Sequence, residues 1–141
     1  MSVRFADVTV GARLPEQTFS IERATLIRYA GASGDFNPIH WNQETAVAVG
    51  LPDVIAHGML TMATAIRVVT DWLGDPGAVL DYKVRFSHPV VVAADAPTQL
   101  AVSAVVRSMD SSDQTAEIQL TASVPGQTVL TKARVRVRLE A

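Results

Sequence analysis

The chain has 141 residues, of which 48% are hydrophobic and 18% are charged. This length suits one domain with a substantial core, and this composition predicts an ordered globular protein. Twelve basic and 14 acidic residues give a net charge of -2, so no basic surface for DNA or RNA is expected. The absence of cysteine excludes a disulfide framework, a thiolate nucleophile and a cysteine-based zinc site.

The amino-terminal residues M-S-V-R-F-A-D lack the basic and then apolar pattern of a secretion signal. No apolar run approaches the roughly 20 residues that a membrane-spanning helix needs. We therefore expect a cytoplasmic protein without a membrane partner.

The first elements are predicted to be extended. Residues 3–10 alternate well enough for a short strand that ends at Gly11, and residues 14–21 form a second extended segment. A helix follows, on which Leu26, Ile27 and Ala30 share one face.

Two further helices are predicted after this one. Residues 42–50 indicate a short helix that is capped by Asn42 and ended by Gly50. Residues 57–74 indicate one long central helix that ends at Gly74. Its expected buried face consists of Met59, Met62, Ala63, Ile66, Val69 and Leu73, with the methionines filling gaps in the core.

The remainder of the chain is predicted to form four strands separated by turns, over residues 79–86, 99–109, 115–124 and 129–139. Early helices followed by an antiparallel meander indicate an α+β domain with the sheet curled around the long helix. The last strand carries basic residues on one face, which we interpret as the solvated side of the sheet. The alternative is that some of its arginines bind phosphates of an acyl carrier.

Chemistry is expected in the segment A-G-A-S-G-D-F-N-P-I-H-W, residues 30–41. Pro38 disfavours a helical conformation at Asn37, so Asn37 is a candidate N-cap with Pro38 at the first helical position. His40 then lies in the first turn, where the positive end of the helix dipole favours a neutral imidazole. Asp35 precedes this turn on an irregular segment and can fold back toward the same space.

An imidazole and a carboxylate that face one space suit the addition or elimination of water, in which one group handles a carbon-bound proton and the other the oxygen. We assign the α-proton to His40 and the hydroxyl or attacking water to Asp35, although the reverse assignment is open. The alternative without catalysis is that Asp35 caps a turn and His40 is a buried, hydrogen-bonded histidine.

The motifs S-G-D-F-N-P-I-H-W at 33–41 and I-A-H-G-M at 55–59 resemble those of the MaoC-like (R)-specific enoyl-CoA hydratases and dehydratases, and most of all the actinobacterial (3R)-hydroxyacyl-ACP dehydratases. The resemblance implies a single hotdog domain over residues 1–141. It implies that Asp35 and His40 are the catalytic pair and that the amide of Gly58 binds the thioester carbonyl. A supporting serine of some family members has no counterpart here, because the region near Ile66 is apolar.

Asn37 and His57 are predicted to support this site, with the His57 ring N–H holding the site loop in place. We assign no metal, because the loose spacing of Asp35, His40, His57 and His88 fits no standard ligand pattern.

The resemblance implies a lyase that interconverts (3R)-hydroxyacyl and trans-2-enoyl thioesters, with CoA or acyl carrier protein as the carrier and no other cofactor. Two alternatives stay open, namely a hotdog thioesterase and a catalytic subunit that is active only beside a non-catalytic hotdog partner. A single domain of this kind leaves a sheet edge unpaired, so we expect a homodimer or a heterodimer with another hotdog subunit.

Overall fold

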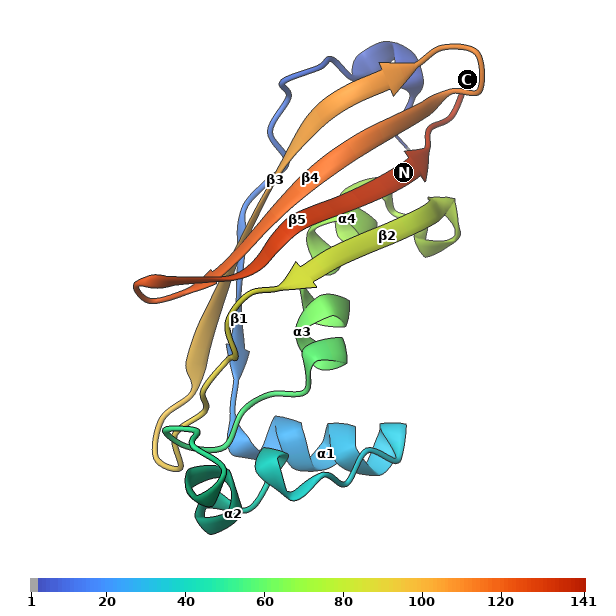
Figure 1. Cartoon of the computed structure of the whole chain (residues 1–141). Coiled ribbons are helices and arrows are strands. Elements are labelled where there is room, and N and C mark those ends of the chain that lie inside the picture. Colours follow the sequence, from blue (N-terminus) through green and yellow to red (C-terminus); the bar gives the residue numbers. More distant parts are fainter. Residues whose placement is uncertain (1–2) are drawn as a thin grey trace.

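The computed structural model describes residues 3–141 and contains a five-stranded antiparallel sheet in the order β1-β3-β4-β5-β2. The strands pair along long ladders, and the sheet is strongly twisted and curled (Figure 1). Their bounds are β1 Gln17–Ile21, β2 Val79–Phe86, β3 Thr98–Asp110, β4 Thr115–Val124 and β5 Gln127–Arg138. The four strands predicted for the second half of the chain are therefore confirmed.

Two consecutive helices, α3 (Gly58–Ala65) and α4 (Arg67–Leu73), lie in the curl of the sheet (Figure 1). The sequence predicted one helix here, but the structure divides it at Ile66. The carbonyl of Met62, one turn earlier, accepts from the Ile66 amide at 3.3 Å and also from the Tyr82 hydroxyl at 2.9 Å. This competing hydroxyl, from β2, gives a physical reason for the interruption. Burial raises the pKa of Tyr82, which keeps its hydroxyl a donor.

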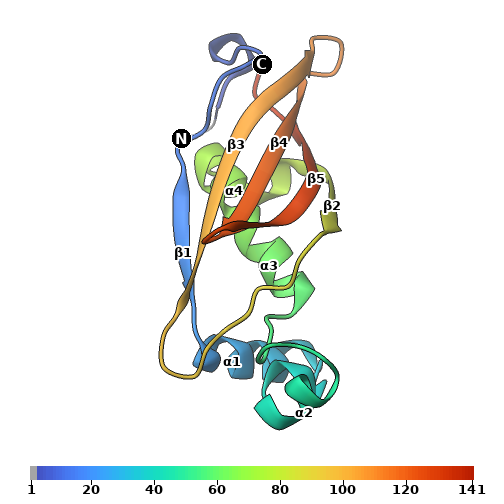
Figure 2. The ribbon, with the colours of Figure 1, turned by 60° about the vertical axis from the view of Figure 1, so that its left-hand side comes forward.

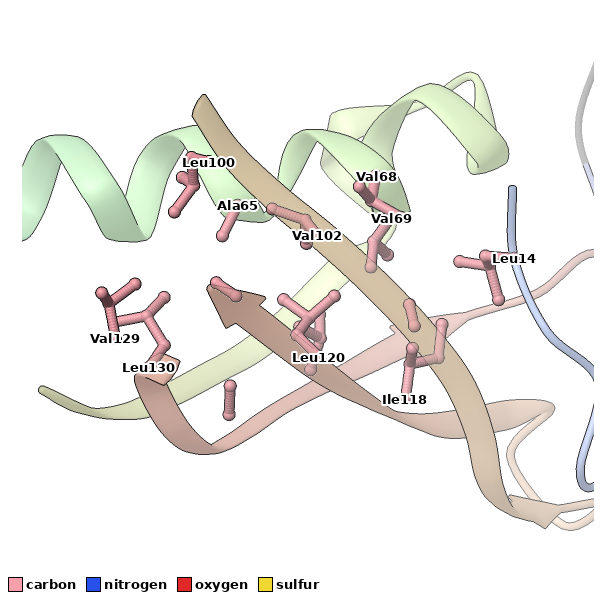
Figure 3. Close-up of a cluster of buried hydrophobic side chains, with 14 of the residues drawn as sticks. Leu14, Ala65, Val68, Val69, Leu100, Val102, Ile118, Leu120, Val129 and Leu130 are labelled. Atoms are coloured by element: carbon pink, nitrogen blue, oxygen red, sulfur yellow. The ribbon is translucent and has the colours of Figure 1, made fainter. Parts of the chain in front are cut away.

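The hydrophobic core lies between α3–α4 and the inner face of the sheet (Figure 3). Ala65, Val68 and Val69 from the helices face Ile118 and Leu120 from β4. These side chains are almost fully removed from water, which makes this layer the main source of hydrophobic stabilisation.

The segment that carries the expected site lies beyond one end of the sheet (Figure 2). It contains α1 (Arg23–Ser33), the 3-10 turn η2 (Pro38–His40) and α2 (Gln43–Ala48). Gly34 ends α1 with a φ of 76°, a left-handed conformation that glycine adopts without strain. Asn42 caps α2 by accepting from the Thr45 amide at 2.9 Å, as predicted.

The strand predicted at residues 3–10 is wrong. The structure has a 3-10 turn at Phe5–Asp7 there, preceded by an isolated bridge between Arg4 and Glu140. The backbone that runs beside β3 comes slightly later, because the Gly11 amide donates to Val106 at 2.8 Å and the Leu14 amide to Ala104 at 3.0 Å. The continuation of the sheet edge is therefore taken by residues after Gly11 and not by the alternating run before it.

The predicted helix faces were partly wrong. Leu26 and Ala30 of α1 are buried, whereas Ile27 is 55% exposed. Of the six residues expected to face the core from the long helix, Val69 and Leu73 are buried, but Met59 is 59% exposed. Thr61, which was not among the six, is buried instead of Met59. The helix is apolar on most of its circumference, so hydrophobicity alone did not define which side meets the sheet.

The basic residues of β5 lie on its outer face, as expected for a solvated side of the sheet. Lys132, Arg136 and Arg138 are exposed. Arg134 pairs with Glu117 at 2.8 Å, and Arg136 pairs with Asp113. In residues 3–141, none of the helices has both the length and the apolar character that crossing a membrane requires.

Candidate active site

The loop before η2 is held by hydrogen bonds from its own side chains. The Asp35 carboxylate accepts from the Asn37 amide at 3.1 Å, and the Asn37 side chain accepts from the Ile39 amide at 3.3 Å. Asn37 is thus the N-cap and Pro38 the first residue of the turn, as the sequence predicted. These short-range contacts orient the turn that carries His40.

His40 and Asp35 face each other across a short gap. The distance from His40 Nε2 to Asp35 Oδ2 is 3.9 Å. This is too long for a direct hydrogen bond, but an oxygen atom placed between them is within reach of both. The structure therefore brings the two predicted proton-transfer groups to one place.

The tautomer of His40 follows from its other ring nitrogen. Nδ1 lies 2.7 Å from the carbonyl oxygen of Ile55, and a carbonyl can only accept. Nδ1 therefore carries the proton, and in the neutral ring Nε2 presents its lone pair toward Asp35. This is the arrangement that a general base needs.

The two side chains differ in their access to water. The His40 side chain is 9% exposed, whereas the Asp35 side chain is 52% exposed. Asp35 thus lies at the mouth of the site and His40 lies inside it.

His40 lines a cavity of about 260 Å³. Gly58 and Thr61 of α3 form part of its wall, and Ile55, Val90 and Leu130 make much of the rest apolar. Gly58 is the first residue of α3, so its N–H has no acceptor within the helix. Together with the helix dipole, this free amide makes the cavity favourable for a partly negative oxygen.

Gly58 is closely packed against the end of β2. A Cβ added at this position would lie 3.2 Å from Cε1 of Phe86, a contact that requires the ring to move. Gly58 was predicted from the sequence, whereas Phe86 and Ser87 were not, and His88 was considered only as a metal ligand; all three also line the cavity. Phe86 is the last residue of β2 and the other two follow it, so no local pattern marks them as cavity residues.

His57 is buried beneath the pair. Its Nε2 donates to the main-chain oxygen of Asp35 at 3.1 Å, so the predicted contact with the site loop is present. Its ring stacks on that of His40, with 3.7 Å between centroids and 23° between planes. On its other side lies Tyr29, at 4.7 Å between ring centroids.

Asp35, His40 and His57 each place one possible metal ligand within 4.8 Å of the others. The geometry nevertheless favours hydrogen bonding. Nε2 of His57 and Nδ1 of His40 are already engaged with carbonyl oxygens. The remaining imidazole lone pairs lie in two nearly parallel ring planes, and one ion cannot lie in both planes. His88, the fourth residue weighed for a metal site, is not part of this cluster.

Residues 4–135 match the family model described as MaoC like domain. The chain therefore belongs to the MaoC-like domain family, and the curled sheet around a central helix is its hotdog fold.

Three similar proteins carry names or titles that bear on chemistry. The 3-hydroxyacyl-thioester dehydratase X of Mycobacterium tuberculosis is 39% identical over 87 residues, which cover 62% of this chain and 30% of that protein. A structure titled MaoC-like dehydratase superposes with a TM-score of 0.96 at 41% identity, covering 99% of this chain and 43% of that one. The R-hydratase PhaJ1 from Pseudomonas aeruginosa superposes with a TM-score of 0.84 at 26% identity, covering 99% and 88%.

This chain thus spans less than half the length of the first two of these proteins. The ChsH1–ChsH2 complex from Mycobacterium tuberculosis also contains a chain of this shape, with a TM-score of 0.82 at 23% identity and coverage of 94% and 99%. At that identity the likeness concerns the fold alone.

Proposed function

We propose that this protein is a hydro-lyase that interconverts (3R)-hydroxyacyl and trans-2-enoyl thioesters, with Asp35 and His40 as the catalytic residues. The observation that carries the proposal is their 3.9 Å separation beside a largely apolar cavity that also contains the amide of Gly58. The hydratases and dehydratases among the similar proteins support the same class of reaction.

The α-proton of a thioester is only weakly acidic, so the charge that builds on the carbonyl oxygen must be stabilised as this proton leaves. The Gly58 N–H is the proposed donor to that oxygen, and its position at the start of α3, where it has no acceptor within the helix, supports this role. In a cavity with little water, such a fixed donor is worth more than it would be in solution.

In the dehydration direction, His40 Nε2 takes the proton from Cα. The electron pair of the C–H bond forms the Cα–Cβ double bond as the bond from Cβ to the hydroxyl breaks. Asp35 supplies a proton to the departing hydroxyl, which leaves as water. Hydration reverses every step, so the pair holds one proton in total, on Asp35 before dehydration and on His40 after it.

The different exposure of the two side chains supports this division of roles. His40 lines the cavity together with Gly58, and a thioester carbonyl at Gly58 brings its adjacent Cα near His40. The Asp35 side chain is 52% exposed to solvent, which supports its proposed role toward the hydroxyl or water.

The test is hydration of crotonyl-CoA by the purified protein, followed as loss of the enoyl-thioester absorbance. We expect loss of absorbance without release of free thiol. Thiol release with the absorbance of the double bond unchanged would instead identify a thioesterase. If neither is observed with the chain alone, the assay is repeated with a candidate hotdog partner subunit.

We also propose that the chain works as a dimer. Within residues 3–141, β2 is at the edge of the sheet with no strand on its outer side. Leu80 and Phe86 of this strand are 40% and 52% exposed, and Met59 of α3 is 59% exposed. Exposed apolar side chains of this size are typical of a surface that a partner covers. Either a second copy or a different hotdog subunit fits this edge, and size-exclusion mass of the purified chain distinguishes them.

CoA and acyl carrier protein both remain proposed carriers. The reaction needs no further cofactor in this scheme, because the thioester activates Cα and the protein supplies both proton-transfer groups.

A further inference from the structure

His57 contacts both proposed proton-transfer residues and precedes Gly58 in the chain. Its side chain donates to the main chain of Asp35, its ring stacks on His40, and its own peptide unit leads into Gly58. The residue is only 2% exposed. Within residues 3–141, no other side chain contacts both Asp35 and His40 in this way.

We propose that His57 is a positioning residue that sets the separation between Asp35 and His40. The donor at Nε2 fixes the main chain of the Asp35 loop, and the flat face of the ring fixes the plane of the His40 imidazole. This inference rests on the proposed function, because the separation matters for a reaction in which both groups act on one substrate.

A histidine supplies both a flat ring for the stack on His40 and an N–H donor for the Asp35 carbonyl. Phenylalanine keeps a flat ring for the stack but has no donor for the Asp35 carbonyl. Glutamine keeps an N–H donor of similar reach but has no ring. Exchanges to these two residues therefore separate the two contacts.

The remaining ring nitrogen shows that the site is not arranged for stability alone. Nδ1 of His57 is buried and has no hydrogen-bond partner among the described residues. A buried polar atom without a partner destabilises a protein, and His57→Phe removes it together with the hydrogen bond from Nε2 to Asp35. These two changes oppose each other, so a residue kept only for folding would show little change from that exchange. A positioning residue would lose activity from it.

The experiment measures thermal stability and steady-state hydration for wild type, His57→Phe and His57→Gln. We expect His57→Phe to unfold at a temperature close to that of wild type, because the lost hydrogen bond to Asp35 and the removed unpartnered nitrogen offset each other, while kcat falls about tenfold to a hundredfold with KM within about twofold. His57→Gln should also lower kcat, because His40 loses the surface that orients its ring.

Gln119→Leu is the matched control. Gln119 lies on β4 and, like His57, has a buried side-chain atom without a partner, but it is outside the candidate site. Its exchange should raise stability and leave kcat unchanged. This separates relief of a buried polar atom from loss of positioning.

A second measurement uses no substrate. The ring-nitrogen chemical shifts of His40 report which nitrogen carries the proton. Wild type and His57→Phe should show the same Nδ1–H signals, and His57→Gln should show shifted or broadened ring-nitrogen signals, because the His40 ring is no longer held in one plane. If His57→Phe does not fold, kcat and the His40 chemical shifts of His57→Gln test the positioning role.

Failure of the proposed function and failure of this inference give different results. Wild-type protein that hydrates no enoyl thioester, either alone or with the candidate partner subunit, removes the function, while the His40 shifts still test the positioning. Active wild type together with unchanged kcat in His57→Phe and in His57→Gln overturns the inference. So does an unchanged His40 spectrum in His57→Gln.

Discussion

The two ends of this molecule are held together in different ways. Around α4, the sheet forms long backbone ladders and a continuous apolar layer, so that many contacts each contribute a part of the stability. Around η2, a few individual hydrogen bonds fix the chain, such as those from Asp35 and Asn37. The stable end supplies a rigid support, and the polar end keeps reactive groups accessible. Changes at the two ends should therefore have separable consequences.

The largest effect is expected from Asp35→Asn and His40→Asn, which alter the reacting groups directly. Each should lower kcat by about 10²- to 10⁴-fold, the range for loss of a general acid or base. Asparagine at 35 keeps an oxygen for the Asn37 amide, and asparagine at 40 keeps a donor near the Ile55 carbonyl. Circular dichroism should therefore remain native.

The double variant provides the control for this prediction. If the two groups act in one step, combining the exchanges should cost about as much as either alone. Turnover near that of wild type in either single variant would remove the corresponding role.

In the opposite region, Leu120→Ala should lower the free energy of unfolding by about 3 kcal/mol, because it leaves a cavity in the core layer. Leu120 is 2% exposed and lies on β4, away from the cavity at His40. Equilibrium urea denaturation measures the loss. Activity per folded molecule should be unchanged, and a drop in kcat before any unfolding would show that the two ends are coupled.

Arg23→Met tests the junction between the ends. Arg23, the first residue of α1, donates to Asp53 at 2.6 Å and to the Val92 carbonyl at 2.7 Å. Both ionic side chains are partly exposed, so we expect a loss of about 1 to 2 kcal/mol rather than the larger cost of a fully buried pair. Asp53→Asn, which keeps an acceptor, should cost less. Denaturation midpoints of the two variants check this order.

The smallest effect is expected from Gln114→Gly in the β3–β4 turn. Gln114 has a φ of 58°, a left-handed conformation that costs a non-glycine residue about 1 kcal/mol. Its side-chain oxygen is also buried without a partner in the described part of the chain. The exchange should stabilise the protein by about 1 kcal/mol, as measured by its melting temperature.

Gly126→Ala, in the β4–β5 turn, is the reverse control for this prediction. Gly126 has a φ of 76° and open space where a Cβ would go. A loss of stability of similar size therefore reports backbone conformation alone. If both exchanges change stability in the same direction, conformational strain is not the cause.

The sequence predicted best those features that depend on neighbours along the chain. The four later strands were placed closely because alternation and turn residues mark both their ends, and Asn37 and Pro38 define η2 locally. The interruption of the central helix was missed, since it involves the Tyr82 hydroxyl from another element. Phe86 was missed for the same reason, because its contact with Gly58 joins β2 to α3.

Other expectations stay predictions. These are the single domain over residues 1–141, the cytoplasmic location and the roles of the site residues. The strand at residues 3–10 failed because alternation does not reveal which segment will lie beside β3.

The unequal exposure of Asp35 and His40 has a consequence for repeated turnover. In the proposed mechanism, each dehydration leaves Asp35 without its proton and His40 with the proton taken from Cα, so both groups must return to their starting states before the next cycle. Because the Asp35 carboxylate meets bulk water and lies 3.9 Å from His40 Nε2, a water molecule that contacts both groups can carry the proton from His40 back to Asp35. The proposed cycle then closes at the exposed side of the pair, without a lid or a domain movement to exchange the proton.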